Sequence, residues 1–174
     1  MREVLEGIIQ AISAGDSGRA ATIAATALAR DEQIPELFVS TDYEISELRG
    51  GEAKQLVHDA IAYYRKHGSE IALAEFANPL GQFKKGELYV YAIDSNGTML
   101  AHPINQRYIG KDFLRVVDFD GKPFIREIIS TANVQGYGWV EYKWLNPISV
   151  RDEVKTVYFE KYDSTIICSG VYEH

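Results

Sequence analysis

Aromatic residues are distributed very unevenly along this chain, and that distribution constrains the fold more than any other feature. Of 11 Tyr, 7 Phe and 2 Trp residues, only Phe38 and Tyr43 precede residue 62. The early part instead has apolar residues at intervals of three and four, as in the run Val4, Leu5, Ile8, Ile9 and Ile12. This spacing predicts amphipathic helices, whereas the later aromatic residues alternate with their neighbours as in strands. The sequence therefore predicts a helical N-terminal segment, residues 1–50, followed by one domain of mixed structure, residues 51–174.

Turn and cap residues divide the second part into elements. The pair Gly50-Gly51 is expected to break the chain before a helix, and Asn96-Gly97 predicts the turn of a hairpin. The expected helices are Glu52–His67, Glu70–Ala77 and Pro123–Thr131. The expected strands are Leu88–Ile93, Thr98–His102, Gly136–Trp144, Val154–Lys161 and Thr165–Tyr172. This order predicts an α+β fold: an antiparallel sheet of about five strands, with a long N-terminal helix and with helices on one face.

Charge and composition exclude several classes of function. The 25 Asp and Glu residues outnumber the 18 Lys and Arg residues and give a net charge of −7, whereas nucleic-acid binding needs a basic surface. The single cysteine, Cys168, cannot form an internal disulfide and is expected to be a buried thiol. No stretch approaches the roughly 20 apolar residues that cross a bilayer, and residues 1–14 lack the pattern of a signal peptide. The usual sequence signatures of enzymes and metal sites are also missing, so we expect neither.

A series of motif blocks resembles a known family. They include Asn96-Gly-Thr-Met-Leu-Ala-His-Pro103, Ile109-Gly-Lys-Asp112, Gly138-Trp-Val-Glu-Tyr-Lys-Trp-Leu-Asn-Pro147 and Ser169-Gly-Val-Tyr172. In this order they resemble the single Cache domain of type 2. The resemblance implies a PAS-like, ligand-sensing module of bacterial chemoreceptors and sensor kinases, usually extracytoplasmic, whose ligands are small carboxylates such as acetate, propionate, pyruvate or lactate.

The residues themselves suggest a pocket for such an anion, which needs apolar walls, a few hydrogen-bond donors and one positive charge. Alternation along the strands groups Tyr89 with Tyr91, and Tyr142 with Trp144. His102 closes the hairpin, where its imidazole could donate a hydrogen bond. The resemblance adds a Lys-x-x-Tyr pair, with the lysine as the cation. The predicted ligand-binding residues are Tyr89, Tyr91, His102, Tyr142, Trp144, Lys155 and Tyr158.

The sequence leaves alternatives open beside a sensor that binds a small organic acid. One is a small acid–base enzyme that uses His102, although no second catalytic group is evident near it. Another is a dimeric interaction domain whose pocket is filled by its own side chains. The same sheet could also hold haem or flavin, for which His102 is the one well-placed axial candidate, and no cofactor is expected. The apolar stripes of the N-terminal helices suit a homodimer.

Overall fold

The computed structural model of this chain describes residues 41–173. The expected helices before residue 41, and with them the expected dimer contacts, lie outside the described residues. One compact unit begins at Ile45 and takes in the rest of the described chain. The division of the chain at residue 51 stays a prediction.

Three helices, a short 3-10 helix and six strands follow one another along the described chain. The helical elements are α3 (Thr41–His67), α4 (Ser69–Phe76), the 3-10 helix η2 (Gln106–Tyr108) and α5 (Phe124–Gln135). The strands are β1 (Lys84–Lys85), β2 (Leu88–Asp94), β3 (Met99–Ala101), β4 (Tyr137–Leu145), β5 (Asp152–Tyr162) and β6 (Thr165–Tyr172). Within the described range, no helix combines the length and apolar character needed to span a membrane.

The strands form one antiparallel sheet in the order β1-β2-β6-β5-β4, and β3 pairs with β2. The last three strands meander, so β4 pairs with β5 and β5 with β6, and β6 then lies beside β2. The α+β fold expected from the sequence is confirmed. The sheet has one strand more than expected, because the two residues of β1 pair with the beginning of β2.

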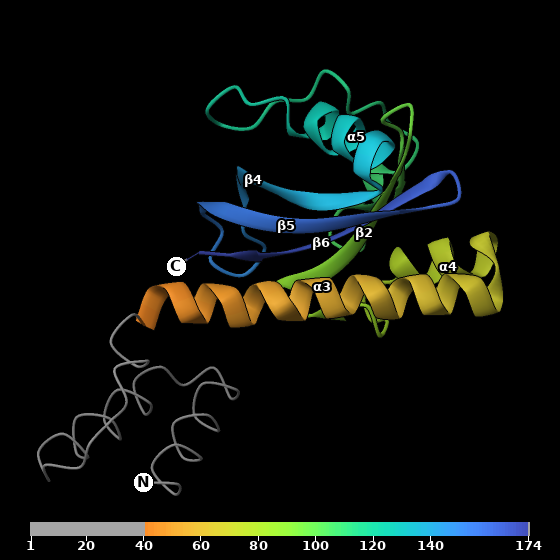
Figure 1. Ribbon diagram of the computed structural model, residues 1–174, viewed down its shortest axis with the longest axis horizontal. Helices are drawn as coiled ribbons and strands as arrows, with labels where there is room; N and C mark the ends of the chain where they lie inside the picture. Colours follow the sequence, from red (N-terminus) through yellow and green to blue (C-terminus); the bar gives the residue numbers. More distant parts are fainter. Residues whose placement is uncertain (1–40, 174) are drawn as a thin grey trace, which may run out of the picture. The chain divides into compact units, whose positions relative to one another are not determined.

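Helices cover both faces of the sheet, rather than one face as the sequence suggested (Figure 1). Helices α3 and α4 lie on one side and α5 on the other. The reason lies in β2, whose five central residues are all buried. Alternation sends Tyr89 and Tyr91 into the core under α5, and Val90 and Ala92 into the core under α3 and α4. A strand that is apolar on both faces needs a helical layer on each side.

Helix α3 continues through the glycine pair at which the sequence predicted a break. It runs without interruption from Thr41 to His67, and Gly50 is buried. A glycine in a helix costs about 1 kcal/mol relative to alanine. Burial of the apolar stripe that follows outweighs that cost, because the stripe packs on the sheet. Its buried members are Ala53, Leu56, Val57, Ala60, Ile61 and Tyr64.

Candidate functional site

The side chain of Lys155 occupies the centre of the core between the sheet and α5. In the register of the sheet, Lys155 on β5 lies between Tyr142 on β4 and Tyr172 on β6. Its Nζ lies 3.8 Å from the ring centroid of Tyr89, 4.6 Å from that of Tyr172 and 5.9 Å from that of Tyr91. These three rings, which we call the tyrosine cage, enclose a lysine that is 0% exposed. An ammonium among aromatic faces is attracted to their negative electrostatic potential.

The amino group of Lys155 lacks a hydrogen-bond acceptor among the described residues. Burial away from water disfavours its charged form and lowers the pKa to about 7, although the negative charge of Cys168 or Glu87 would act in the opposite direction. A buried ammonium without an acceptor is energetically costly. An anion bound beside Nζ would supply both the acceptor and the opposite charge.

The hydroxyl groups of the surrounding tyrosines form two pairs. Tyr91 and Tyr142 lie 3.1 Å apart at their hydroxyl oxygens, and Tyr89 and Tyr172 lie 3.5 Å apart. Tyr172 donates to the carbonyl of Leu145 at 3.0 Å, so Tyr89 is the donor in its pair. The Tyr91–Tyr142 pair holds two protons and uses one between its members, and Tyr91 also lies within hydrogen-bond reach of the sulfur of Cys168.

Burial keeps these hydroxyls protonated. It raises the pKa of Tyr89 to about 12, and it raises the pKa of Tyr91, Tyr142 and Tyr172 well above the ordinary value. The tyrosines therefore act as neutral donors beside a single titrating amine.

His102 lies against the same tyrosines, just after β3. Its ring centroid is 5.3 Å from that of Tyr89 and 5.2 Å from that of Tyr108. Its Nδ1 accepts a hydrogen bond from the backbone N–H of Asn105 at 3.0 Å, so the neutral ring carries its proton on Nε2. Burial, and then the charge of Lys155, lower the pKa of His102 to about 3. The imidazole is therefore a neutral donor at ordinary pH, and an imidazole with so low a pKa is a poor general base.

A surface groove of about 360 Å³ opens next to the cage. It is lined by His102, Ile104, Asn105, Tyr108, Phe119, Trp144, Leu145 and Pro147. His102 belongs to both the groove and the cluster around Lys155, so it stands between the two. A larger groove, of about 430 Å³, lies between α3 and the β1–β2 edge and is lined by three acidic residues and Lys85. That lining does not suit an anion.

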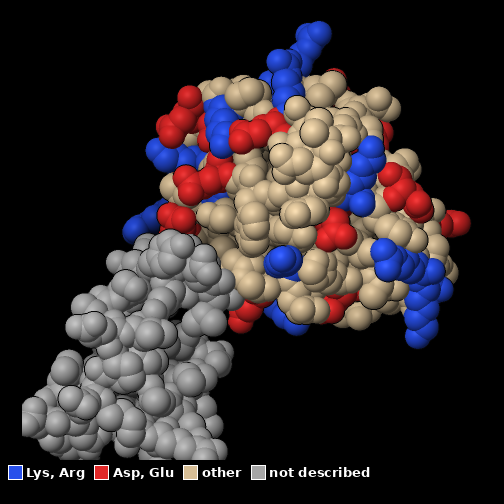
Figure 2. Space-filling view, in the orientation of Figure 1, with Lys and Arg blue, Asp and Glu red and all other residues tan. Residues whose placement is uncertain are grey.

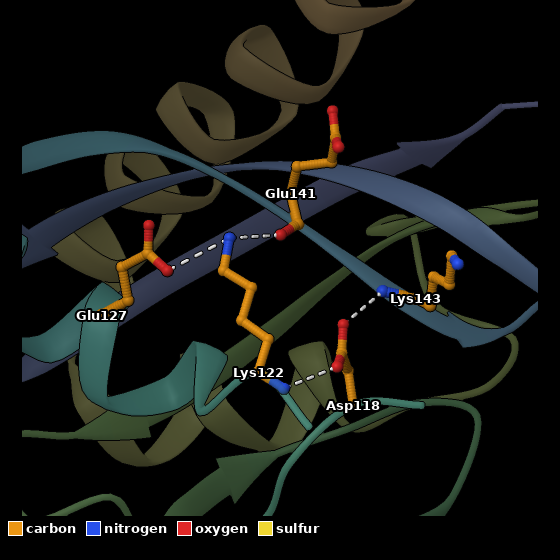
Figure 3. A network of polar contacts seen from close by, with 5 residues as sticks. All are labelled: Asp118, Lys122, Glu127, Glu141 and Lys143. Atoms are coloured by element: carbon orange, nitrogen blue, oxygen red, sulfur yellow. Dashed lines mark hydrogen bonds and ion pairs between the residues drawn. The ribbon is translucent and has the colours of Figure 1, made fainter. Parts of the chain in front are cut away.

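The loop that carries Phe119 is fixed to the edge strand β4 by Asp118 and Lys122 (Figure 3). One oxygen of Asp118 accepts the backbone N–H groups of Asp120 and Lys122, and the other accepts that of Lys143 on β4. Lys122 Nζ donates to the carbonyl of Glu141 and pairs with Glu127 on α5. Burial alone would raise the pKa of Asp118, but the three N–H donors outweigh it and lower the pKa. The loop thereby covers backbone groups of an otherwise open sheet edge.

Charged groups at the surface do not by themselves mark an anion site. Figure 2 shows Lys and Arg side chains interspersed with Asp and Glu side chains on the face in view, with uncharged atoms at its centre. Within residues 41–173, no three His, Cys, Asp or Glu side chains lie close enough together to hold a metal ion. The buried Lys155 is therefore the feature of the described residues on which an anion site could be built.

The structure brings together most of the residues that the sequence singled out. Tyr89, Tyr91, His102, Tyr142 and Lys155 share one core, and Trp144 packs against that core and lines the groove.

Tyr158 does not join this cluster. It lies on the opposite face of the sheet, where its ring packs against Trp139 at 5.0 Å and its hydroxyl donates to Glu160 at 3.1 Å. Tyr158 is three positions after Lys155, and residues an odd number apart on a strand point to opposite faces. The Lys-x-x-Tyr spacing therefore places Tyr158 on the opposite face of the sheet from Lys155.

Two aromatic residues at the site were not predicted. Tyr172 forms one wall of the cage, and Tyr108 contacts the ring of His102. Tyr172 ends the motif block Ser169-Gly-Val-Tyr172, and its alternation with the buried Cys168 was a usable signal. Tyr108 lies on η2, and the signal that could have found this turn is its N-cap residue Asn105, whose side chain accepts the backbone N–H of Arg107.

Comparison with known proteins places this chain in a family. The model of the family "Single Cache domain 2" matches residues 38–174. The chain belongs to the single Cache domain 2 family. Solved structures support the same fold. A methyl-accepting chemotaxis protein from Vibrio parahaemolyticus superimposes with a TM-score of 0.66 at 19% identity, over 77% of this chain and 95% of that one. A Cache chemosensory domain described for its recognition of carboxylic acids gives a TM-score of 0.58 at 23% identity, over 82% of this chain and 100% of the other.

A curated relative is the methyl-accepting chemotaxis protein McpP of Pseudomonas putida, which is 31% identical to this Cache domain over 86 residues. The match covers 48% of this chain and 16% of McpP, so the chain corresponds to a small part of that receptor. The relatives named above are methyl-accepting chemotaxis proteins and a Cache chemosensory domain.

Proposed function

We propose that this Cache domain binds a small organic carboxylate, of the class of acetate, propionate, pyruvate or lactate, through the ammonium of Lys155. One observation carries the proposal: Lys155 is fully buried in the tyrosine cage, and no described residue provides an acceptor for its amino group. A carboxylate would accept a charge-assisted hydrogen bond from Nζ, which is stronger than a hydrogen bond between neutral groups.

The surroundings of Lys155 favour a small anion over other ligands. The tyrosine hydroxyls and His102 are neutral, so they add no competing negative charge, and the Nε2–H of His102 can donate to an oxygen acceptor. A ligand that enters by the groove would reach the cage past His102, which lines the groove and contacts the ring of Tyr89. The ligand's short carbon chain would contact the aromatic rings, where apolar surface is favourably buried.

The alternatives are less well supported by the same geometry. An acid–base enzyme would need His102 to exchange a proton near neutral pH, whereas its pKa is about 3. A domain filled only by its own side chains would leave the buried amino group of Lys155 without an acceptor, whereas an apolar side chain of similar size would fill the same space at lower cost. The likeness to McpP and to the carboxylate-recognising Cache domain supports a sensory role in chemotaxis.

Calorimetry with paired ligands tests the proposal. Acetate and propionate are expected to bind at pH 6, while acetamide and propionamide, which have the same shape and no charge, are not. Lys155→Met is expected to weaken propionate binding by roughly 10- to 100-fold, the range for a charge-assisted hydrogen bond. Lys143→Met is the matched control, since Lys143 lies on β4 at the surface and pairs with Asp120. If no carboxylate binds at millimolar concentration, or if Lys155→Met binds as wild type does, the proposal is wrong.

A further inference from the structure

We propose that carboxylate binding by this domain is coupled to the uptake of a proton by Lys155, so that the domain responds to the anion and to acidity together. The inference rests on the proposed function and adds a regulation of the same site. It starts from the geometry of the cage, which offers Lys155 aromatic faces and no counter-ion.

The ligand-free and the ligand-bound domain favour different forms of Lys155. In the ligand-free domain the amine has lost its hydration, and three ring faces replace only part of that hydration. The neutral amine is therefore a stable occupant near neutral pH, in agreement with a pKa of about 7. A carboxylate at hydrogen-bond distance from Nζ favours the ammonium, and it raises the pKa again. When a carboxylate binds at a pH above the ligand-free pKa of Lys155, the amine must therefore take up a proton.

The groups that face Lys155 from the neighbouring elements do not titrate in competition with it. On β2 and β4 they are Tyr89, Tyr91 and Tyr142, on β6 they are Cys168 and Tyr172, and after β3 there is His102. Burial raises the pKa of the tyrosines and of the thiol, and it lowers that of His102, so all of them are neutral between pH 6 and pH 9.

Glu87, just before β2, is the acidic group whose charge reaches Lys155. Its carboxylate accepts a hydrogen bond from the buried amide of Asn146 at 3.0 Å. Its charge favours the ammonium, but burial has the larger effect on the pKa of Lys155 and lowers it. Lys155 is consequently the group at the cage that changes charge near neutral pH.

The coupling has a calculable size. Only the protonated fraction of Lys155 is competent to bind the anion, and the apparent Kd rises in inverse proportion to that fraction. With the pKa of about 7, the apparent Kd is expected to rise about tenfold from pH 6 to pH 8 and roughly a hundredfold by pH 9. Simple carboxylic acids are fully ionised throughout this interval, so the change belongs to the protein.

Titration calorimetry of the wild-type domain with propionate, in two buffers of different ionisation enthalpy, measures the coupling directly. We expect uptake of about one proton per propionate at pH 8 and about a tenth of a proton at pH 6. Lys143→Met, which removes an exposed lysine, is expected to retain both values, and Lys155→Met is expected to bind weakly with no pH dependence.

The possible failures are distinguishable. Propionate that binds with the same Kd from pH 6 to pH 9, and without proton uptake, overturns the coupling and leaves carboxylate binding intact. Propionate that fails to bind at every pH overturns the proposed function and the coupling with it. The wild-type measurement decides between these results even if Lys155→Met does not fold.

Discussion

Replacement of Lys155 by methionine is expected to stabilise the ligand-free domain near and below neutral pH, and to abolish a pH dependence that the wild type shows. Lys155 is fully buried, and its ammonium has no acceptor among residues 41–173. Methionine has an unbranched chain of similar length without a charge, so it fills the same space and avoids the cost of desolvating an ammonium. The variant tests the environment of Lys155 without any ligand.

The sign and size follow from the pKa of Lys155, about 7 in the folded domain against an ordinary value of 10.5. Below pH 7 both the folded and the unfolded chain are protonated, and the full penalty of the buried charge applies. Between the two pKa values the unfolded chain holds a proton that the folded chain has released, so the free energy of unfolding rises with pH. At about 1.4 kcal/mol per pKa unit, the rise from pH 6 to pH 9 reaches about 3 kcal/mol.

For the wild type, the measured rise in the free energy of unfolding from pH 6 to pH 9 is therefore expected to be about 3 kcal/mol. Lys155→Met has no titrating group at this position. The difference between the stability profiles of the two proteins therefore separates the contribution of Lys155 from that of every other titrating group.

Urea unfolding, followed by tryptophan fluorescence at four pH values from 6 to 9, measures this difference. The buffers must contain no carboxylate, because a bound anion would supply the missing acceptor. Lys143→Met is the control and should follow the wild type, since its side chain is exposed and pairs with Asp120. Parallel stability profiles for wild type and Lys155→Met would refute the reasoning, because they would mean that the amine is hydrated or paired in solution.

Two further predictions concern the framework of the site. Gly170→Ala is expected to destabilise the domain by about 1–3 kcal/mol, because a Cβ there would lie 2.5 Å from Val157 Cγ2. The control is Gly51→Ala, in an open part of α3, which should be neutral or stabilising by up to about 1 kcal/mol. Both are measured by urea unfolding, and equal effects would contradict the close approach of Val157 to Gly170. Asp118→Asn should destabilise the domain by about 1–3 kcal/mol at pH 7, because the loss of charge weakens bonds to three backbone N–H groups, including that of Lys143. Because the folded-state pKa of Asp118 is lowered, its contribution to stability is present at neutral pH and disappears as the pH falls through that pKa. The stabilities of the wild type and of Asp118→Asn should therefore converge in acid. A constant difference at all pH values would argue against these hydrogen bonds.

Local patterns in the sequence were sufficient to predict the types of the elements. They also predicted two groups of site residues that share a strand face, Tyr89 with Tyr91 and Tyr142 with Trp144. Alternation over Leu88–Ile93 placed Tyr89 and Tyr91 on one face, and the Asn96-Gly97 turn predicted the hairpin that brings His102 to its end. Strand β6 has the bounds that were expected for it. These features depend on neighbours in the chain, and the period of a strand or the conformation of a turn is a local property.

The same local rules were insufficient where contacts between residues far apart in the chain outweigh local conformational preference. The pair Gly50-Gly51 suggested a break, but burial of the apolar stripe of α3 against the sheet outweighed the low helix propensity of glycine. The Lys-x-x-Tyr spacing suggested that Tyr158 belongs to the site, whereas the pleat of β5 turns Tyr158 toward α3.

By itself, the sequence determined the α+β fold, the family and the supply of tyrosines, one histidine and one lysine from which a site could be built. Only the tertiary structure decided that Lys155 is enclosed by Tyr89 and Tyr172, because β2, β5 and β6 come together through pairings between residues far apart in the chain. The exclusion of water at that meeting point lowers the pKa of Lys155 and leaves its amine without an acceptor. Burial is a property of the assembled core, and no stretch of sequence specifies it alone.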